Sequence, residues 1–399
     1  MRRLIFIFIF LGTTYTVSAD AKQGVMDLSL YNFNEPIELN GEWEFYWSKL
    51  LTPNQSFYNK KFLEFPGLWN GQVVGKDTTK PIGYATYKLR VILPDQPTHY
   101  SMFIDDMYCA YQLFINGRPV AANGIVSHTR EQYTPEWRPQ VIDIHELTGT
   151  LELTLHIANF DHSKGGANRS ILLGTSQGIS SFFNTNKVLD ISLTALFMAM
   201  AIFFFIRFGF ITLDLSSLFF SLFCITYSYR ILGSDMYFLL EYLPGIPWEA
   251  VISIEYISLY ISPLFLGIHL QEMYPAESNK KILRVLYILC VAFTLCVPIF
   301  PVAIYSRLNL YFFMMCAVFM FYGFTIYISA FINKQPGSIY GILSGVIAFT
   351  VFAFLALEYS LILERQKLMT YIFQIVFLGI HSIQLIVNTN ARMHQDLAS

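Results

Sequence analysis

The chain has 399 residues, of which 54% are hydrophobic and only 14% are charged, and its formal net charge is −2. Because a soluble protein carries about 25% charged residues, a large part of this chain must face lipid. A nearly neutral chain also lacks the cationic surface that nucleic acid or an anionic membrane patch would need. We therefore expect a membrane protein that does not bind nucleic acid.

The first residues have the pattern of a secretory signal peptide. Two arginines precede an apolar run from Leu4 to Leu11, and the small residues Val17 and Ala19 follow at the spacing of a signal peptidase site. The alternative, a first transmembrane helix, is disfavoured because the run is shorter than the ~20 residues that a span needs. We expect residues 1–19 to be the signal peptide, cleaved after Ala19.

Residues 20–183 alternate apolar and polar side chains, as strands with one buried face do. The alternation is clearest at residues 41–47, 84–93 and 150–158, and Asn116-Gly117 is a strong hairpin signal. Cys109 is the one cysteine in this half, so the domain has to fold without an internal disulfide. These patterns predict an antiparallel β sandwich.

Several segments of this half resemble the galactose-binding-like jelly roll, a fold that also forms the N-terminal domain of many β-glycosidases. They are Gly41-Glu-Trp-Glu-Phe45, Phe65-Pro-Gly-Leu-Trp69, the strand from Gly83, Ala110-Tyr-Gln-Leu-Phe-Ile-Asn-Gly117 and the strand from Gly149 to Asn159. In glycosidases this domain is an accessory module. The resemblance therefore implies binding of a sugar-like ligand and no hydrolysis.

Candidate ligand contacts lie on predicted loops, where aromatic faces and planar donors suit a sugar ring. These candidates are Trp69, Tyr133, Trp137, Arg138, His162, Asn168 and Arg169. Two alternatives stay open: Trp69 as a core or turn anchor, and the 161–169 loop as a contact for the membrane helices.

No catalytic or metal-binding arrangement stands out in this half. Asp105 and Asp106 are adjacent, so on a strand they would point to opposite faces and could not share a substrate. The histidines lack the spacing of a metal site. We expect no metal, no cofactor and no enzymatic activity.

The second half contains seven apolar stretches long enough to cross a bilayer. We predict helices at 188–206, 215–232, 248–269, 282–300, 308–332, 339–358 and 370–388, within a membrane domain at 184–390 and before a short tail at 391–399. The last stretch has no lysine for a retinal Schiff base, which excludes a rhodopsin.

An exported first half and seven crossings would place the C-terminus in the cytoplasm. Lysines and arginines near the helix ends then divide six inside against four outside, in weak agreement with the positive-inside rule. The inside set is Arg207, Lys280, Lys281, Arg284, Lys334 and Arg392, and the outside set is Lys187, Arg307, Arg365 and Lys367.

Ionisable residues inside the predicted helices are costly in lipid and therefore informative. Arg230, Glu255 and Glu358 would lie in the outer half of the membrane, where the arginine could pair with either carboxylate. We predict a polar cluster that couples the exported domain to the helices; a static ion pair is the alternative. His381 is expected to form an interhelical hydrogen bond.

The leader, jelly roll and seven helices together resemble the bacterial seven-transmembrane receptors with diverse intracellular signalling modules. The resemblance implies a receptor in the bacterial inner membrane that binds an extracytoplasmic small molecule or glycan. Such receptors usually continue into an output domain, whereas this sequence ends at Ser399, so a separate signalling protein is the expected partner besides the lipid bilayer. A homodimer stays open. The alternatives are a transporter or membrane enzyme with a sugar-recognising domain, and a surface-anchored binding module.

Overall fold

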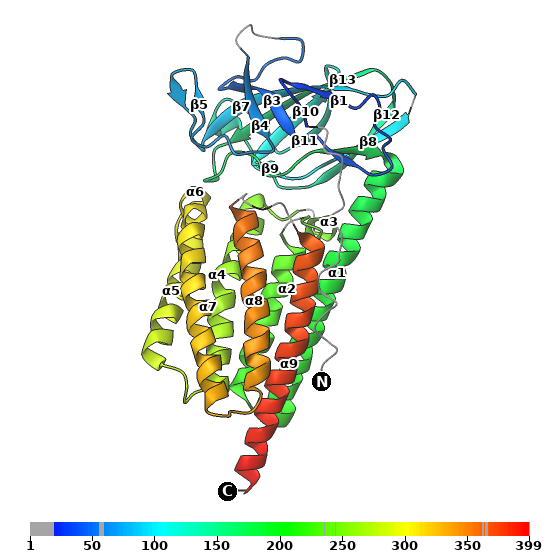
Figure 1. The fold of residues 1–399 in the computed structure, drawn as a ribbon. Coiled ribbons are helices and arrows are strands. Elements are labelled where there is room, and N and C mark those ends of the chain that lie inside the picture. Colours follow the sequence, from blue (N-terminus) through cyan, green and yellow to red (C-terminus); the bar gives the residue numbers. More distant parts are fainter. Residues whose placement is uncertain are drawn as a thin grey trace. The chain divides into compact units, whose positions relative to one another are not determined.

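The computed structural model describes residues 20–55, 60–96, 98–234, 236–243, 245–360, 363 and 366–398. The predicted signal peptide at 1–19 and Arg365 lie outside the described residues. The chain forms two compact units: a β unit, with residues 20–134, 140–159 and 165–182, and a helical unit, with residues 135–139, 160–164 and 183–398. Figure 1 labels most of the elements of both.

The β unit contains two larger antiparallel sheets and two short strand pairs, so the predicted β sandwich is confirmed. The first sheet runs in the order β11 (Arg118–Asn123), β10 (Ala110–Ile115), β13 (Thr150–Asn159), β7 (Gly83–Ile92), β3 (Gly41–Trp47) and β4 (Lys61–Phe65), with β1 (Val25–Asp27) parallel to β7. The second runs in the order β12 (Gln140–Leu147), β8 (Thr98–Ile104), β15 (Leu172–Thr175) and β2 (Ile37–Glu38). The short pairs are β14 (Gly166–Ala167) with β9 (Met107–Tyr108), and β5 (Val73–Val74) with β6 (Asp77–Thr78).

The predicted hairpin at Asn116-Gly117 is confirmed as the turn between β10 and β11. Both turn residues have positive φ, 47° for Asn116 and 82° for Gly117. A type I′ turn needs this left-handed backbone at both central positions, and asparagine followed by glycine adopts it most readily. The turn chemistry therefore sets the register of the two strands.

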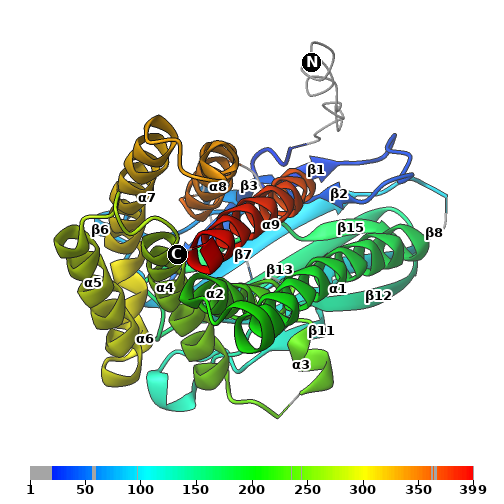
Figure 2. The same ribbon diagram turned by 90° about the horizontal axis from the view of Figure 1, so that it is seen from below.

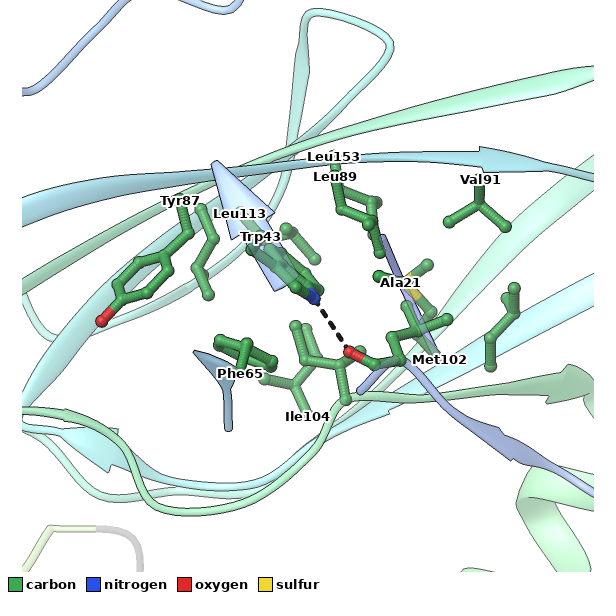
Figure 3. Packing of buried hydrophobic residues seen from close by; sticks show 14 of the residues in the cluster. Ala21, Trp43, Phe65, Tyr87, Leu89, Val91, Met102, Ile104, Leu113 and Leu153 are labelled. Carbon is green, nitrogen blue, oxygen red and sulfur yellow. Dashed lines mark hydrogen bonds between the residues drawn. The ribbon is translucent and has the colours of Figure 1, made fainter. Parts of the chain in front are cut away.

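The apolar faces of the two sheets meet in one core, which Figure 3 shows around Trp43. Leu89 and Leu153 from the first sheet face Met102 and Ile104 from the second. The indole Nε1 of Trp43 donates to Leu39 O at 2.9 Å, so its polar atom is satisfied although the residue is fully buried. Burying a ring of this size contributes much of the stability of the unit.

The helical unit contains seven helices long and apolar enough to cross a membrane, so the predicted number is confirmed. They are α1 (Ser176–Arg207, continued as a π-helix to Thr212), α2 (Leu215–Leu232), α4 (Trp248–Met273), α5 (Lys280–Ile299), α7 (Asn309–Ile332), α8 (Ser338–Tyr359) and α9 (Lys367–Ala398). Short helical turns, α3 (Leu239–Tyr242), α6 (Val302–Tyr305) and a 3₁₀ turn (Ser306–Leu308), join some of them, and another 3₁₀ turn (Arg130–Gln132) belongs to the β unit.

Figure 2 looks along the helices. The main packing pairs are α2 with α4, α4 with α5, α7 with α8, and α8 with α9. A shared apolar core includes Phe197 of α1, Phe220 of α2, Tyr327 of α7 and Leu378 of α9. Because α4 contacts α2, α5, α7 and α9, a displacement of α4 reaches most of the helical unit.

Two predicted boundaries were wrong. Helix α1 begins at Ser176, twelve residues before the predicted 188, because its first turns are polar and hydropathy marks only the apolar stretch. The last helix was predicted to end at 388, before a short tail at 391–399, but α9 continues as helix to Ala398. Adding residues to an existing helix avoids the unfavourable nucleation step that an isolated peptide of this length would face.

Candidate coupling site

Two segments that interrupt the β unit in sequence belong to the helical unit. Residues 135–139 directly precede β12, and residues 160–164 directly follow β13. Both lie at the end of the helical unit where α4 begins and α8 ends, which we call the near end. Each segment is thus covalently continuous with a strand of the β unit and packed among helices.

His162 is the buried anchor of the second segment. Its Nε2 lies 3.1 Å from the hydroxyl of Tyr256 in α4, and its Nδ1 accepts a hydrogen bond from the backbone N–H of Lys164 at 3.1 Å. An Nδ1 that accepts from an N–H carries no proton, so the neutral ring donates from Nε2 to Tyr256. Burial, together with the nearby Lys164 charge, lowers the pKa of His162 from 6.5 to about 3.

Lys164 binds the C-terminal end of α8. Its ammonium donates to Tyr359 O at 2.7 Å and lies 3.4 Å from the centroid of the Tyr359 ring. A cation at this position interacts favourably with the unpaired carbonyls and the negative end of the helix dipole, and with the ring face. Burial lowers the pKa of Lys164 from 10.5 to about 8.

Trp137 is the buried anchor of the first segment. Its ring centroid lies 5.7 Å from that of His162, 5.9 Å from Tyr237 and 5.6 Å from Trp248. The perpendicular contact with Trp248 has the edge-to-face geometry that aromatic pairs favour. The two segments therefore contact each other as well as the start of α4.

The predicted polar cluster is adjacent to these rings. Arg230 of α2 lies 3.5 Å from Glu255 of α4, and the hydroxyl of Tyr237 donates to the other Glu255 oxygen at 3.3 Å. Glu358 accepts from the backbone N–H of Gln366 at 2.9 Å. The role of these residues in coupling stays a prediction.

The two segments therefore connect to consecutive residues of α4. Trp137 of the first segment contacts the ring of Tyr237, whose hydroxyl donates to Glu255. His162 of the second segment lies within hydrogen-bonding distance of Tyr256. Contacts from both segments thus lead to one turn of α4. Among the described residues, no group of three or more His, Cys, Asp or Glu side chains could hold a metal ion.

Of the other predicted ligand residues, Arg138 lies in the same segment as Trp137, and the rest belong to the β unit. Trp69 is fully buried, and its Nε1 donates to Pro81 O at 3.1 Å. Its ring therefore has no free face for a ligand, and we correct its assignment to the alternative, a core anchor.

The remaining candidates differ in how much surface they expose. Arg169 forms a 2.6 Å ion pair with the buried Asp105, and Tyr133 is also buried. Asn168 is half-buried, and Arg138 is partly exposed, 3.7 Å from Glu136.

His381 of α9 is fully buried and lies 2.8 Å, between Nε2 atoms, from His269 of α4. This pair lies near the end of α4 that is opposite to the near end, and His269 was not predicted as a site residue. His269 is four residues before the end of α4, and no sequence pattern there indicated a contact with α9.

Lys164 lies in the 161–169 loop, for which contact with the membrane helices was the open alternative. The sequence did not predict Tyr256 as a contact, nor a buried ion pair between Asp190 of α1 and Lys367 of α9 at 2.7 Å. Asp190 could have been found, because it is an acidic residue inside a predicted apolar span. Tyr256 gave no such signal, since tyrosine is common in these helices.

A β sandwich followed by seven apolar helices defines a multi-pass membrane protein with an N-terminal β domain. The family described as 7TM diverse intracellular signalling matches residues 187–387, just over half of the chain. The chain therefore belongs to this family, which confirms the resemblance noted in the sequence.

Solved structures of glycosidases are similar to part of the chain. A β-glucuronidase from Faecalibacterium prausnitzii is 14% identical, with a TM-score of 0.29, over 35% of this chain and 31% of that chain. A β-glycosidase from Bacteroides vulgatus is 17% identical, with a TM-score of 0.26, over 35% of this chain and 20% of that chain. The chain thus spans less than a third of either glycosidase. No curated protein matches the chain.

Proposed function

We propose that this protein is a membrane sensory receptor without enzymatic activity of its own. Its β unit binds an external ligand, and the helices pass the resulting conformational change to a separate signalling protein. The observation that carries this proposal is a set of contacts between α4 and two segments that continue into strands of the β unit. His162, after β13, lies within hydrogen-bonding distance of Tyr256 of α4. Trp137, before β12, contacts Trp248 of α4 and also Tyr237, which donates a hydrogen bond to Glu255 of α4. Membership of a signalling family supports the same function.

The proposed orientation places the β unit outside the bacterial inner membrane. Seven crossings put the two ends of the helical unit on opposite sides, so α9 then ends in the cytoplasm. The secretory pattern of residues 1–19 and the excess of lysine and arginine on the inner side support this orientation. A signalling partner would therefore contact the last turns of α9.

We propose a carbohydrate-related ligand for the β unit. Asn168, in the β unit, and Arg138, in the segment that continues into β12, are partly exposed and could donate to hydroxyls. Tyr133 and Trp137 are buried in this state, so they could contact a ligand only after the segments rearrange. Binding that favours such a rearrangement would shift the population of receptor states.

The test is a ligand screen on the full chain in lipid nanodiscs, using glycans and small periplasmic metabolites with thermal-shift detection. A true ligand raises the melting temperature in proportion to the logarithm of its concentration above Kd. Arg138→Ala and Asn168→Ala should each weaken the response, whereas Arg118→Ala, an exposed arginine on β11, serves as the matched control. Ligand binding that is equally strong in Arg138→Ala, Asn168→Ala and the unsubstituted protein would contradict the proposed role of these two residues.

A transporter is the second candidate function. The buried His269–His381 pair favours it, because ionisable groups inside a helical membrane domain often mark an ion or substrate path. Uptake of radiolabelled sugar into proteoliposomes that depends on His381 would replace the receptor proposal with this one. Tight binding without uptake would support the receptor.

A further inference from the structure

A buried polar chain connects four helices in the half of the helical unit away from the near end. It runs from Ser216 of α2 through His269 of α4 and His381 of α9 to Ser344 of α8 and Gln384 of α9. All five residues are fully buried or nearly so. Buried polar groups of this kind must satisfy one another because water is excluded.

The shortest contacts favour one tautomer of each ring. Nδ1 of His269 lies 2.8 Å from Ser216 O, a carbonyl that can only accept, and 3.0 Å from the Ser216 hydroxyl, so the shorter contact favours a proton on this nitrogen. In that neutral ring, Nε2 of His269 accepts and Nε2 of His381 donates across the 2.8 Å contact. Nδ1 of His381 is then an acceptor 3.2 Å from the Ser344 hydroxyl, which also lies 3.2 Å from Gln384 Oε1.

This arrangement is directional and holds only while both rings are neutral and in register. Protonation of His269 at Nε2 would place two N–H groups against each other. A shift of α4 along α9 by about one turn, ~5.4 Å, would separate the two Nε2 atoms completely. The pair therefore distinguishes two relative positions of α4 and α9, as a two-state contact does.

Further contacts bind the end of α4 to the same helix. Arg392 of α9 donates to Glu272 O at 2.8 Å and also to Met273 O, at the C-terminal end of α4. Gln384 of α9 donates to the hydroxyl of Tyr274 at 3.3 Å. Residues of α9 from His381 to Arg392 thus bind the last turn of α4 and the residue after it.

Tyr256 and His269 are thirteen residues apart on α4, which corresponds to about 20 Å along the helix. Tyr256 receives the contact from His162, and His269 makes the contact with α9. We propose that the His269–His381 hydrogen bond is the joint through which a displacement of α4 moves α9, which makes α9 the output helix. This inference rests on the proposed receptor function and assigns the route of its signal.

The test uses the full chain in nanodiscs, with Trp137→Ala as a substitute for ligand-driven release of the near-end segments. Spin labels at His394 of α9 and at the exposed Val285 of α5 report the position of α9 by double electron–electron resonance. The partly exposed Cys296 is replaced by serine. Trp137→Ala should shift the distance by about 1–2 Å, the size of interhelical shifts in switching proteins.

The same shift is then measured in backgrounds that alter the joint. His381→Phe keeps the ring and removes the donor, so the shift should disappear; His381→Asn, which retains a donor, should restore at least part of it. Ser382→Ala, the next residue on α9, is the matched control and should keep the full shift. If His381→Phe does not fold, His269→Phe removes the acceptor of the same bond and carries the same expectation.

A full shift in folded His381→Phe or His269→Phe would overturn the inference. If Trp137→Ala alters the fluorescence of Trp248 at the near end but leaves α9 in place, the route through the histidine pair fails while the proposed coupling of the segments to α4 survives. If neither the near end nor α9 responds to Trp137→Ala, the proposed coupling itself fails.

Discussion

Acid should release the 160–164 segment from the helices, and His162 should be responsible. The ring is neutral where it contacts Tyr256, and its pKa is held at about 3 by burial, against 6.5 for a solvated histidine. Between these two values the released segment binds a proton and the bound segment does not. The bound state therefore loses stability as pH falls from 6.5 towards 3 and keeps it above 6.5.

The magnitude follows from the gap between the two pKa values. One pKa unit corresponds to about 1.4 kcal/mol, so the bound state loses about 2 kcal/mol at pH 5 and about 4 kcal/mol near pH 3. A loss of 2 kcal/mol reduces the ratio of bound to released segment about thirtyfold. A free-energy loss of this size is comparable to the energy of the contacts that hold the segment, so we expect release within an accessible pH range.

The assay is ¹⁹F NMR of the full chain in nanodiscs, labelled with 5-fluorotryptophan. Trp137→Phe assigns the resonance of Trp137, whose ring contacts His162 at 5.7 Å. The bound resonance should weaken as pH falls from 7 to 4. His162→Gln should remove this dependence, whereas His99→Gln, at an exposed histidine of β8, should leave it unchanged. A Trp137 resonance that stays constant to pH 4, or that titrates equally in His162→Gln, would refute the reasoning.

Three further predictions concern other parts of the structure. Lys164→Met should abolish the gain in bound-state stability expected as pH rises from 8 to 10.5, where only the released lysine stays protonated; amide exchange in the last turn of α8, compared with the unsubstituted protein at each pH, would check this. Glu255→Gln should leave ligand affinity unchanged and alter the response of the receptor, and an unaltered response would rule out a coupling role. Gly117→Ala should destabilise the β unit by about 1 kcal/mol, because an alanine at φ 82° is strained; calorimetry would check this, with Gly209→Ala, where an added Cβ meets no atom within 4 Å, as the control.

The sequence predicted the main elements because their patterns depend on local physics. Alternation in residues 84–93 became β7, whose side chains from Ala85 to Val91 are buried on every second position. Hydropathy gave the seven spans because a bilayer imposes a minimum apolar length. The polar helical residues from Ser176 and after Asn388 were not predicted, because hydropathy identifies only the apolar part of a helix.

Most of the candidate site could not be predicted in the same way. Arg230 and Glu255 were found because a charge inside a span needs a partner. Lys164 and Tyr256 contact groups far away in sequence, and neither residue is unusual where it stands. Trp69 satisfied the composition expected of a sugar site, but tertiary packing buries it completely. Residue type alone does not distinguish a binding platform from a core anchor.

The strength of the near-end contacts limits the kind of ligand that could drive this receptor. One charge-assisted helix cap, one histidine–tyrosine hydrogen bond and a few ring contacts together contribute several kcal/mol. Moving a two-state equilibrium from 1:99 to 99:1 requires a differential binding energy of about 5.5 kcal/mol. A ligand that binds one state alone supplies RT ln(1 + c/Kd), where c is its concentration, so it reaches that value only at about 10⁴ times its Kd. A ligand present at about 1 mM would therefore need a Kd of about 0.1 μM to drive the full shift. If a larger apolar contact held Trp137 and His162 in place, the ligand would need a still lower Kd to release the segments.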